Sequence, residues 1–169
     1  LPDRVQRVRF ELELGKLDDA ERHMDALERS YRARNDQALA LARLDGAYRA
    51  ELAIARGDPR TAEERARAAL AGWQEVRGTH ADREDLLRIL GASLVDQGRW
   101  KEALETLAAA ATIARTRHEF EERLALIDVE RARALAGSGR KVEAEALAKQ
   151  TRAVLRRFPS FLRARAAID

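Results

Sequence analysis

The sequence predicts an all-α protein, a superhelical solenoid of antiparallel helix pairs arranged in four repeats. Glycines recur 42, 41 and 41 residues apart, and each is followed five residues later by an alanine. The four pairs are Gly15 and Ala20, Gly57 and Ala62, Gly98 and Ala103, and Gly139 and Ala144. Between the glycines, apolar residues recur every three or four positions, as they do along one face of a helix. A fixed period of this length is typical of chains that stack one supersecondary unit on the next.

The composition agrees with a single helical domain. The chain of 169 residues has 46% hydrophobic, 36% charged and only 5% aromatic residues, which is typical of a folded, helix-rich protein. It contains no cysteine, so disulfide and thiolate chemistry are excluded. No apolar run approaches the roughly 20 residues that span a bilayer, and the first residues lack the layout of a signal peptide. We therefore expect no membrane association and a cytoplasmic location.

Each repeat is predicted to be a helix, a tight turn and a second helix. We place the repeats at about 1–35, 36–78, 79–118 and 119–159, and interpret 160–169 as the start of a further or capping helix. The second helices are expected at 18–34, 59–77, 100–117 and 141–158. In the second turn, Gly57 can take the left-handed conformation that closes a helix. Asp58 then caps the next helix, with Pro59 in its first turn. The alanine after each glycine is small because the paired helices approach closely there.

The ends of the sequence indicate a fragment of a larger protein. The chain does not begin with methionine, and it stops soon after 160–168, which resembles the opening of another helix. Apolar residues also occur near both ends, where a free repeat array needs polar caps. They are Val5, Val8 and Phe10 at one end, and Phe161, Leu162 and Ile168 at the other. Self-association through the terminal repeats is therefore an expected behaviour of the isolated chain.

The third repeat carries a family resemblance. Its residues Leu87, Leu90-Gly91 and Leu94, followed by Gly98, Ala103, Leu107 and Ala110, resemble the tetratricopeptide pattern W-x2-L-G-x2-Y…A-x3-F, with leucines in place of aromatic residues. The other repeats keep the second half of the pattern. Their first helices depart from it, with Arg7-Val8, Arg49-Ala50 and Arg131-Ala132 at the Leu-Gly position.

The repeat length narrows the resemblance. An ordinary tetratricopeptide unit has about 34 residues, so these units look like the long-helix variety found in kinesin light chains and in sensor segments of large bacterial regulators. HEAT repeats, at roughly 40–47 residues, are an alternative that the glycine-alanine turn fits less well.

No motif in the sequence indicates catalysis, so we predict that the protein is not an enzyme and uses no cofactor or metal. The three histidines, His23, His80 and His118, are not spaced to place two imidazoles on one helical face. The Gly137–Arg140 cluster lacks the lysine-hydroxyl pair of a phosphate loop. Paired acids such as Glu63-Glu64 lie near helix starts, where negative charge offsets the helix dipole.

The resemblance implies that the first helix of each pair lines a concave, peptide-binding face. Equal steps back from each turn glycine select the candidate residues Arg9, Glu51, Arg88, Ala92, Asp96, Val129 and Arg133. Family members that clamp a carboxyl terminus use lysine and asparagine in such rows, and this chain has neither there. Because arginine binds carboxylates bidentately, the expected partner is a protein or peptide, and one with acidic side chains is favoured. The alternative is that these arginines pair with glutamates of adjacent helices.

A second basic cluster lies near the end of the sequence. It comprises Arg152, Arg156, Arg157, Arg163 and Arg165, and no acidic residue follows until Asp169. Such a patch could bind an acidic partner or phosphate. The net charge is only +3, from 32 basic and 29 acidic residues, which argues against a nucleic-acid binder.

The sequence therefore predicts a protein-interaction scaffold or regulatory domain of a larger, bacterial-type protein. The alternative is a ligand-sensing or intramolecular regulatory array in a transcription regulator or Ser/Thr kinase. An RNA-binding or hydrolytic role is a third, weaker hypothesis.

Overall fold

The computed structural model describes residues 2–33, 40–72, 80–116, 120–158 and 160–168. Across these ranges the chain is helical and contains no strand, as the sequence predicts. None of the helices in these ranges combines the length and the apolar character that crossing a membrane requires.

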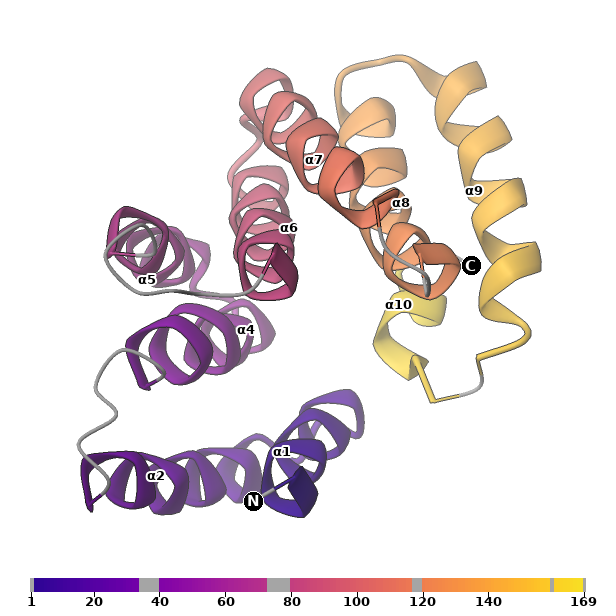
Figure 1. Cartoon of the computed structure of the whole chain (residues 1–169). Helices are drawn as coiled ribbons and strands as arrows, with labels where there is room; N and C mark the ends of the chain where they lie inside the picture. The colour runs from indigo at the N-terminus through magenta and orange to yellow at the C-terminus, as the bar shows by residue number, and fades with distance from the viewer. Residues whose placement is uncertain (1, 34–39, 73–79, 117–119, 159, 169) are drawn as a thin grey trace.

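The helices follow one another in chain order. Their bounds are α1 (Pro2–Glu13), α2 (Leu17–Ala33), the π-helical segment η1 (Ala40–Arg49) continued by α4 (Ala50–Ala55), α5 (Pro59–Gly72), α6 (His80–Asp96), α7 (Trp100–Ala114), α8 (Phe120–Gly137), α9 (Lys141–Leu155) and α10 (Leu162–Ala166). From α1 to α9, consecutive helices pack against one another. Figure 1 shows a curved row in which α1, α4, α6 and α8 lie on the inner side and α2, α5, α7 and α9 on the outer side.

The predicted second helices begin at, or one residue before, their expected positions. Helix α7 ends at Ala114 and α9 at Leu155, earlier than predicted, because turn residues close both helices. At the end of α7, for example, the Thr116 hydroxyl donates to the Ile113 carbonyl at 2.7 Å. The expected ends of α2 and α5 lie outside the described residues.

The four turn glycines adopt the conformation that the sequence predicts. Each has a positive φ, between 69° and 84°. At Gly57 the amide donates to the Ile54 carbonyl at 3.0 Å, and the next amide, of Asp58, donates to the Ala53 carbonyl at 2.9 Å. This pair of bonds satisfies carbonyls that a helix end leaves unpaired. The same two bonds recur at the other three turns, and the Asp58 carboxylate caps α5 by accepting from the Thr61 amide at 3.1 Å.

The alanines that follow the glycines are buried, as predicted. Ala20, Ala62 and Ala103 are fully inaccessible, and Ala144 is nearly so. Helices also approach closely in the third pair, where a Cβ added to Gly91 would overlap the side chain of Leu107.

Three apolar clusters hold the row together. The largest joins α4, α5, α6, α7 and α8 through small residues such as Ala62 and Ala103 and larger ones such as Leu94 and Leu107. A second joins α1 and α2 to η1 and α4. The third joins α8 and α9 to the segment that contains α10. Nine of the fifteen buried residues of the largest cluster are alanines, so small changes in side-chain volume there affect packing directly.

Segment 160–168 does contain a short helix, α10, at the predicted place. Figure 1 shows α10 on the inner side of the row, next to α8. Ile168 is buried and Phe161 half-buried in the third cluster, and Val8 is buried in the second, so three of the six apolar residues that suggested self-association are wholly or partly covered. Self-association remains a prediction.

Candidate binding groove on the inner face

The seven residues predicted to form a concave face line one cavity. It has a volume of about 560 Å³ and lies among α1, α4, α6, α8 and α10. Arg9 comes from α1, Glu51 from α4, the set Arg88, Ala92 and Asp96 from α6, and Val129 and Arg133 from α8. We call this cavity the inner groove. The structure thus brings together residues spread over 125 positions of sequence, while their role in binding remains a prediction.

Helix periodicity explains this placement. The three candidate residues on α6 are spaced four positions apart, and so are the two candidate residues on α8. This spacing puts each set on one stripe of its helix. The opposite stripe of α6, including Leu90 and Leu94, is buried in the largest apolar cluster. Each inner helix therefore packs one stripe against its neighbours and turns another toward the groove.

Two groove arginines are engaged by carboxylates of the inner helices. Arg88 of α6 pairs with Glu51 of α4, and Arg133 of α8 pairs with Asp96 of α6 at 2.6 Å. Arg133 also donates to Glu130, on its own helix, at 2.7 Å. Arg88 thus pairs with a glutamate of another helix, as the alternative predicted, whereas the partner of Arg133 on another helix is an aspartate.

Burial does not remove the positive charge of Arg88. Burial by itself lowers the pKa of Arg88, but the nearby carboxylates of Glu51 and Asp85 outweigh it and raise that pKa above its ordinary value. The Nε atom of Arg88 is buried without a hydrogen bond, and the Asp85 carboxylate lies 3.6 Å from it. Arg88 is thus a fixed positive charge, and its Nε donor is buried without a hydrogen-bond acceptor.

Arg9 differs from the other two. Within the part of the chain that the structure describes, no carboxylate pairs with it. Its charge acts on Tyr48, whose pKa is raised chiefly by burial and is lowered in part by Arg9. Glu122, on the opposite wall at α8, is likewise without an ion-pair partner among the described residues. The side chain of Arg163 also lacks an ion pair among the described residues, so a partner in the groove would meet two unpaired guanidiniums, of Arg9 and Arg163, and the unpaired carboxylate of Glu122.

The lining as a whole is electrically balanced. Its four guanidiniums belong to Arg9, Arg88, Arg133 and Arg163, and its five carboxylates to Glu13, Glu51, Asp96, Glu122 and Glu130. The seven candidate residues alone carry three arginines and two acidic residues, and Glu13, Glu122 and Glu130 of the lining reverse that balance. The groove thus has no net positive charge that would select an acidic peptide.

The remaining lining is apolar. It includes Phe10, Ile54, Leu126 and Phe161. Phe10 is 57% exposed, which is unusual for a large aromatic side chain beside a cavity. Exposed apolar groups next to a cavity with fixed polar partners are typical of binding surfaces.

The predicted basic patch is not a single surface. Arg152 donates from Nε to the Ile168 carbonyl at 2.9 Å, and Arg157 pairs with Glu121 at 2.7 Å. Arg163 lines the inner groove, whereas Arg156 directly follows α9 and is exposed. Arg165 is half-buried in α10. Sequence proximity alone therefore grouped side chains that have separate structural roles.

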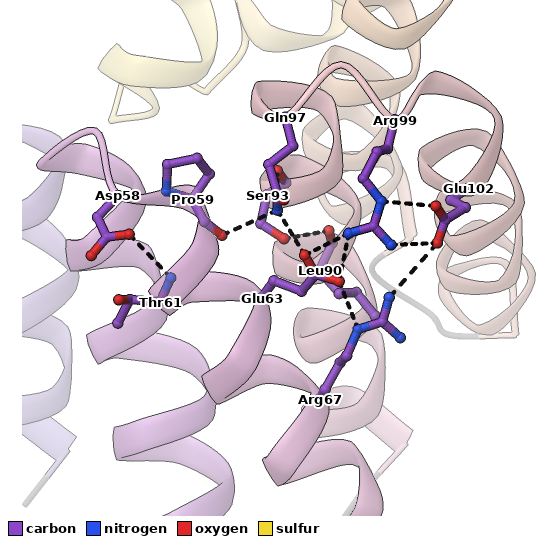
Figure 2. A network of polar contacts seen from close by, with 10 residues as sticks. All are labelled: Asp58, Pro59, Thr61, Glu63, Arg67, Leu90, Ser93, Gln97, Arg99 and Glu102. Carbon is purple, nitrogen blue, oxygen red and sulfur yellow. Dashed lines mark hydrogen bonds and ion pairs between the residues drawn. The ribbon is translucent and has the colours of Figure 1, made fainter.

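Sequence reasoning missed a polar network between the second and third helix pairs (Figure 2). The Glu63 carboxylate accepts hydrogen bonds from Gln97 Nε2 at 2.8 Å, from Arg67 Nε at 2.8 Å and from Arg99 Nη1 at 2.7 Å. Burial alone would raise the pKa of Glu63, but these three donors outweigh it and lower the pKa to about 2. Glu63 thus ties α5 to the α6–α7 turn. The only sign of this network in the sequence is the separation between Glu63 and Arg99, which is close to the repeat period.

No group of three or more histidine, cysteine, aspartate or glutamate side chains that could hold a metal ion occurs in the described part of the chain.

No protein-family model, curated protein or solved structure matches the sequence or fold of this chain. The interpretation of the inner groove therefore rests on its own geometry.

Proposed function

We propose that this chain is a tetratricopeptide-like helical repeat domain whose inner groove binds a segment of a partner protein. In this proposal the domain acts as a scaffold or regulatory module, not as an enzyme. The observation that carries the proposal is the convergence of all seven candidate residues, from four successive inner helices, on one cavity of about 560 Å³.

The repeated local geometry supports the repeat assignment. The same pair of turn hydrogen bonds occurs at all four glycines, and a buried alanine follows each one. The contact between Gly91 and Leu107 fits the Leu-Gly position of the tetratricopeptide pattern. Stacked units of this kind present extended concave surfaces, which repeat proteins use for binding.

The chemistry of the groove favours a partner segment with apolar anchors. Arg88 and Arg133 already have carboxylate partners, so a carboxylate of the partner would have to displace an existing ion pair. Phe10 and Leu126 offer apolar contact surface without such a cost. Interface energy is usually concentrated in a few such aromatic and aliphatic contacts.

The volume of the groove also favours a second candidate function, the sensing of a small ligand. A cavity of about 560 Å³ falls within the range of roughly 300–1,000 Å³ that is typical of ligand pockets. Its walls come from both ends of the chain, so a bound ligand would contact α1 and α10 at once. A sensor of this kind should show a ligand-dependent rise in melting temperature, and a peptide-binding domain should not respond to small metabolites.

Substitution of Phe10 tests the proposed function. Peptides selected on the chain from a displayed random library should bind a Phe10→Ala variant at least about tenfold more weakly than the parent chain, because truncation of an aromatic anchor typically costs more than ~1.4 kcal/mol. Binding affinity can be measured by fluorescence polarisation.

Val142→Ala is the matched control. Val142 is 82% exposed, on the outer helix α9, and does not line the groove, so its truncation should leave peptide affinity unchanged. Selected peptides that bind both variants as tightly as the parent chain would show that binding occurs elsewhere. A library that yields no binder would instead favour the ligand-sensing function.

A further inference from the structure

Helix α10 is not part of a helix pair, and it crosses the inner side of the row. The Glu13 carboxylate, at the end of α1, accepts a hydrogen bond from the Arg163 amide at 2.9 Å, across 150 positions of sequence. Figure 1 shows α10 beside α8 and on the side that faces α1. The first and last helices of the described chain are thus joined over the inner groove.

The contacts of this segment have the spacing of a helix that binds in a groove. Ala164 lies three positions after Phe161, and Ile168 lies seven positions after it. All three pack in the third apolar cluster with Ala125 and Val129 of α8. Phe161 is the residue before α10, Ala164 lies inside it and Ile168 follows its end by two residues, so together they turn one side of the segment toward α8, as the anchors of an amphipathic helix do in an apolar groove. By contrast, Leu162, outside this set, is 43% exposed.

The polar contact does not depend on the sequence of the bound segment. Arg163 uses its main-chain amide, one of the N–H groups that any helix leaves unpaired in its first turn. The acceptor, the Glu13 carboxylate, lines the groove. Any helix that began at the same place could offer Glu13 the same donor.

The segment is held by few interactions. Helix α10 has only five residues, and helices much shorter than about 12 residues are marginal in water without tertiary contacts. Among the described residues, the segment is anchored by the apolar contacts with α8 and α9, by the ring contact between Phe158 and Phe161, by the bond to Glu13, and by the bond from Arg152 Nε to the Ile168 carbonyl at 2.9 Å. A competing segment has to replace these contacts.

We propose that α10, which forms one wall of the inner groove, is an intramolecular ligand of the surface made by α8 and the end of α1. The partner is a short helical segment with an aromatic residue followed by small and aliphatic residues at steps of three and seven, and it displaces α10 and takes over the bond to Glu13. This proposal rests on the proposed function, because it takes the inner groove and its walls as the binding site. It adds the class of partner and identifies the wall of the groove that this partner replaces.

A peptide with the sequence of residues 158–169, added to the intact chain, tests the proposal. In the parent chain the tethered segment competes at an effective concentration of about millimolar, so the added peptide should bind weakly. A Phe161→Ala chain, whose own segment has lost its aromatic anchor, should bind the same peptide at least about tenfold more tightly. Ile168→Ala provides a second chain with the same expected result, and circular dichroism checks that both variants are folded.

Variants of the peptide show whether it occupies the place of α10. A peptide with Phe161→Ala should lose binding to the Phe161→Ala chain, and a peptide with Leu162→Ala should retain it, because Leu162 is not an anchor. Adding Glu13→Ala to that chain should weaken binding about threefold to tenfold. Equal affinity for parent and variant chains, or no binding to either variant, would overturn the proposal. These experiments use the chain's own segment as the probe. Their outcome therefore does not depend on whether library peptides bind or on the effect of Phe10→Ala.

Discussion

An Ala103→Leu variant should lose about 2–3 kcal/mol of unfolding free energy. Ala103 is 0% exposed and lies in the largest apolar cluster, where α6 and α7 approach each other. Three added carbon atoms have no free volume to occupy, so the two helices must separate or the side chain must leave its preferred rotamer. The change is measurable as a lower midpoint of urea unfolding with an unchanged slope.

Ala109→Leu is the control for this prediction. Ala109 is on the same helix but exposed, and alanine and leucine have similar helix propensities. We expect the stability of this variant to stay within about 0.5 kcal/mol of the parent chain. If the two substitutions shift the midpoint equally, the claim that the helices approach closely at Ala103 is wrong.

The second large effect is the acid sensitivity that Glu63 confers. Because its donors lower the pKa of Glu63 from 4.5 to about 2, the folded state holds this carboxylate ionised more strongly than the unfolded state does. The resulting stabilisation is complete above about pH 4.5 and is lost as the pH falls toward 2. Its upper size is on the order of 3 kcal/mol. A Glu63→Gln variant should therefore be less stable than the parent chain at pH 7, with a difference that shrinks below pH 4.5.

Urea unfolding at a series of pH values between 7 and 2.5 measures this difference. Glu64→Gln is the matched control, since the neighbouring Glu64 is exposed and has no ion-pair partner in the described part of the chain. It should follow the parent chain at every pH. Parallel curves for the parent chain and Glu63→Gln over the whole range would show that the hydrogen bonds from Gln97 and Arg99 do not stabilise the carboxylate.

The sequence was sufficient to predict the local geometry of the fold. Gly57 and Asp58 specify a helix end and a helix start through backbone conformation and capping, which depend only on neighbouring residues. The positions of Arg88 and Ala92 on a common face follow from helix periodicity. The convergence of the candidate residues on the inner groove follows once equivalent positions of successive helices are aligned.

The sequence was not sufficient where partners are chosen by tertiary geometry. Glu63 was interpreted as a helix-start charge, because nothing local shows that Gln97 and Arg99 approach it from the next pair. The bond between Glu13 and the Arg163 amide depends on the curvature of the entire row. Arg152 and Arg157 were grouped by their proximity in sequence, but a main-chain carbonyl and Glu121 engage them separately.

The most direct test of the proposed function is an amide chemical-shift map of the isotope-labelled chain with a library-selected peptide. We predict shifts concentrated on the inner helices, at Glu51, Ala92 and Val129, which line the groove. Amides of the outer helices, such as those of Ala109 and Val142, should stay unchanged. Shifts confined to the outer helices, with none at the inner residues, would contradict a binding function of the inner groove.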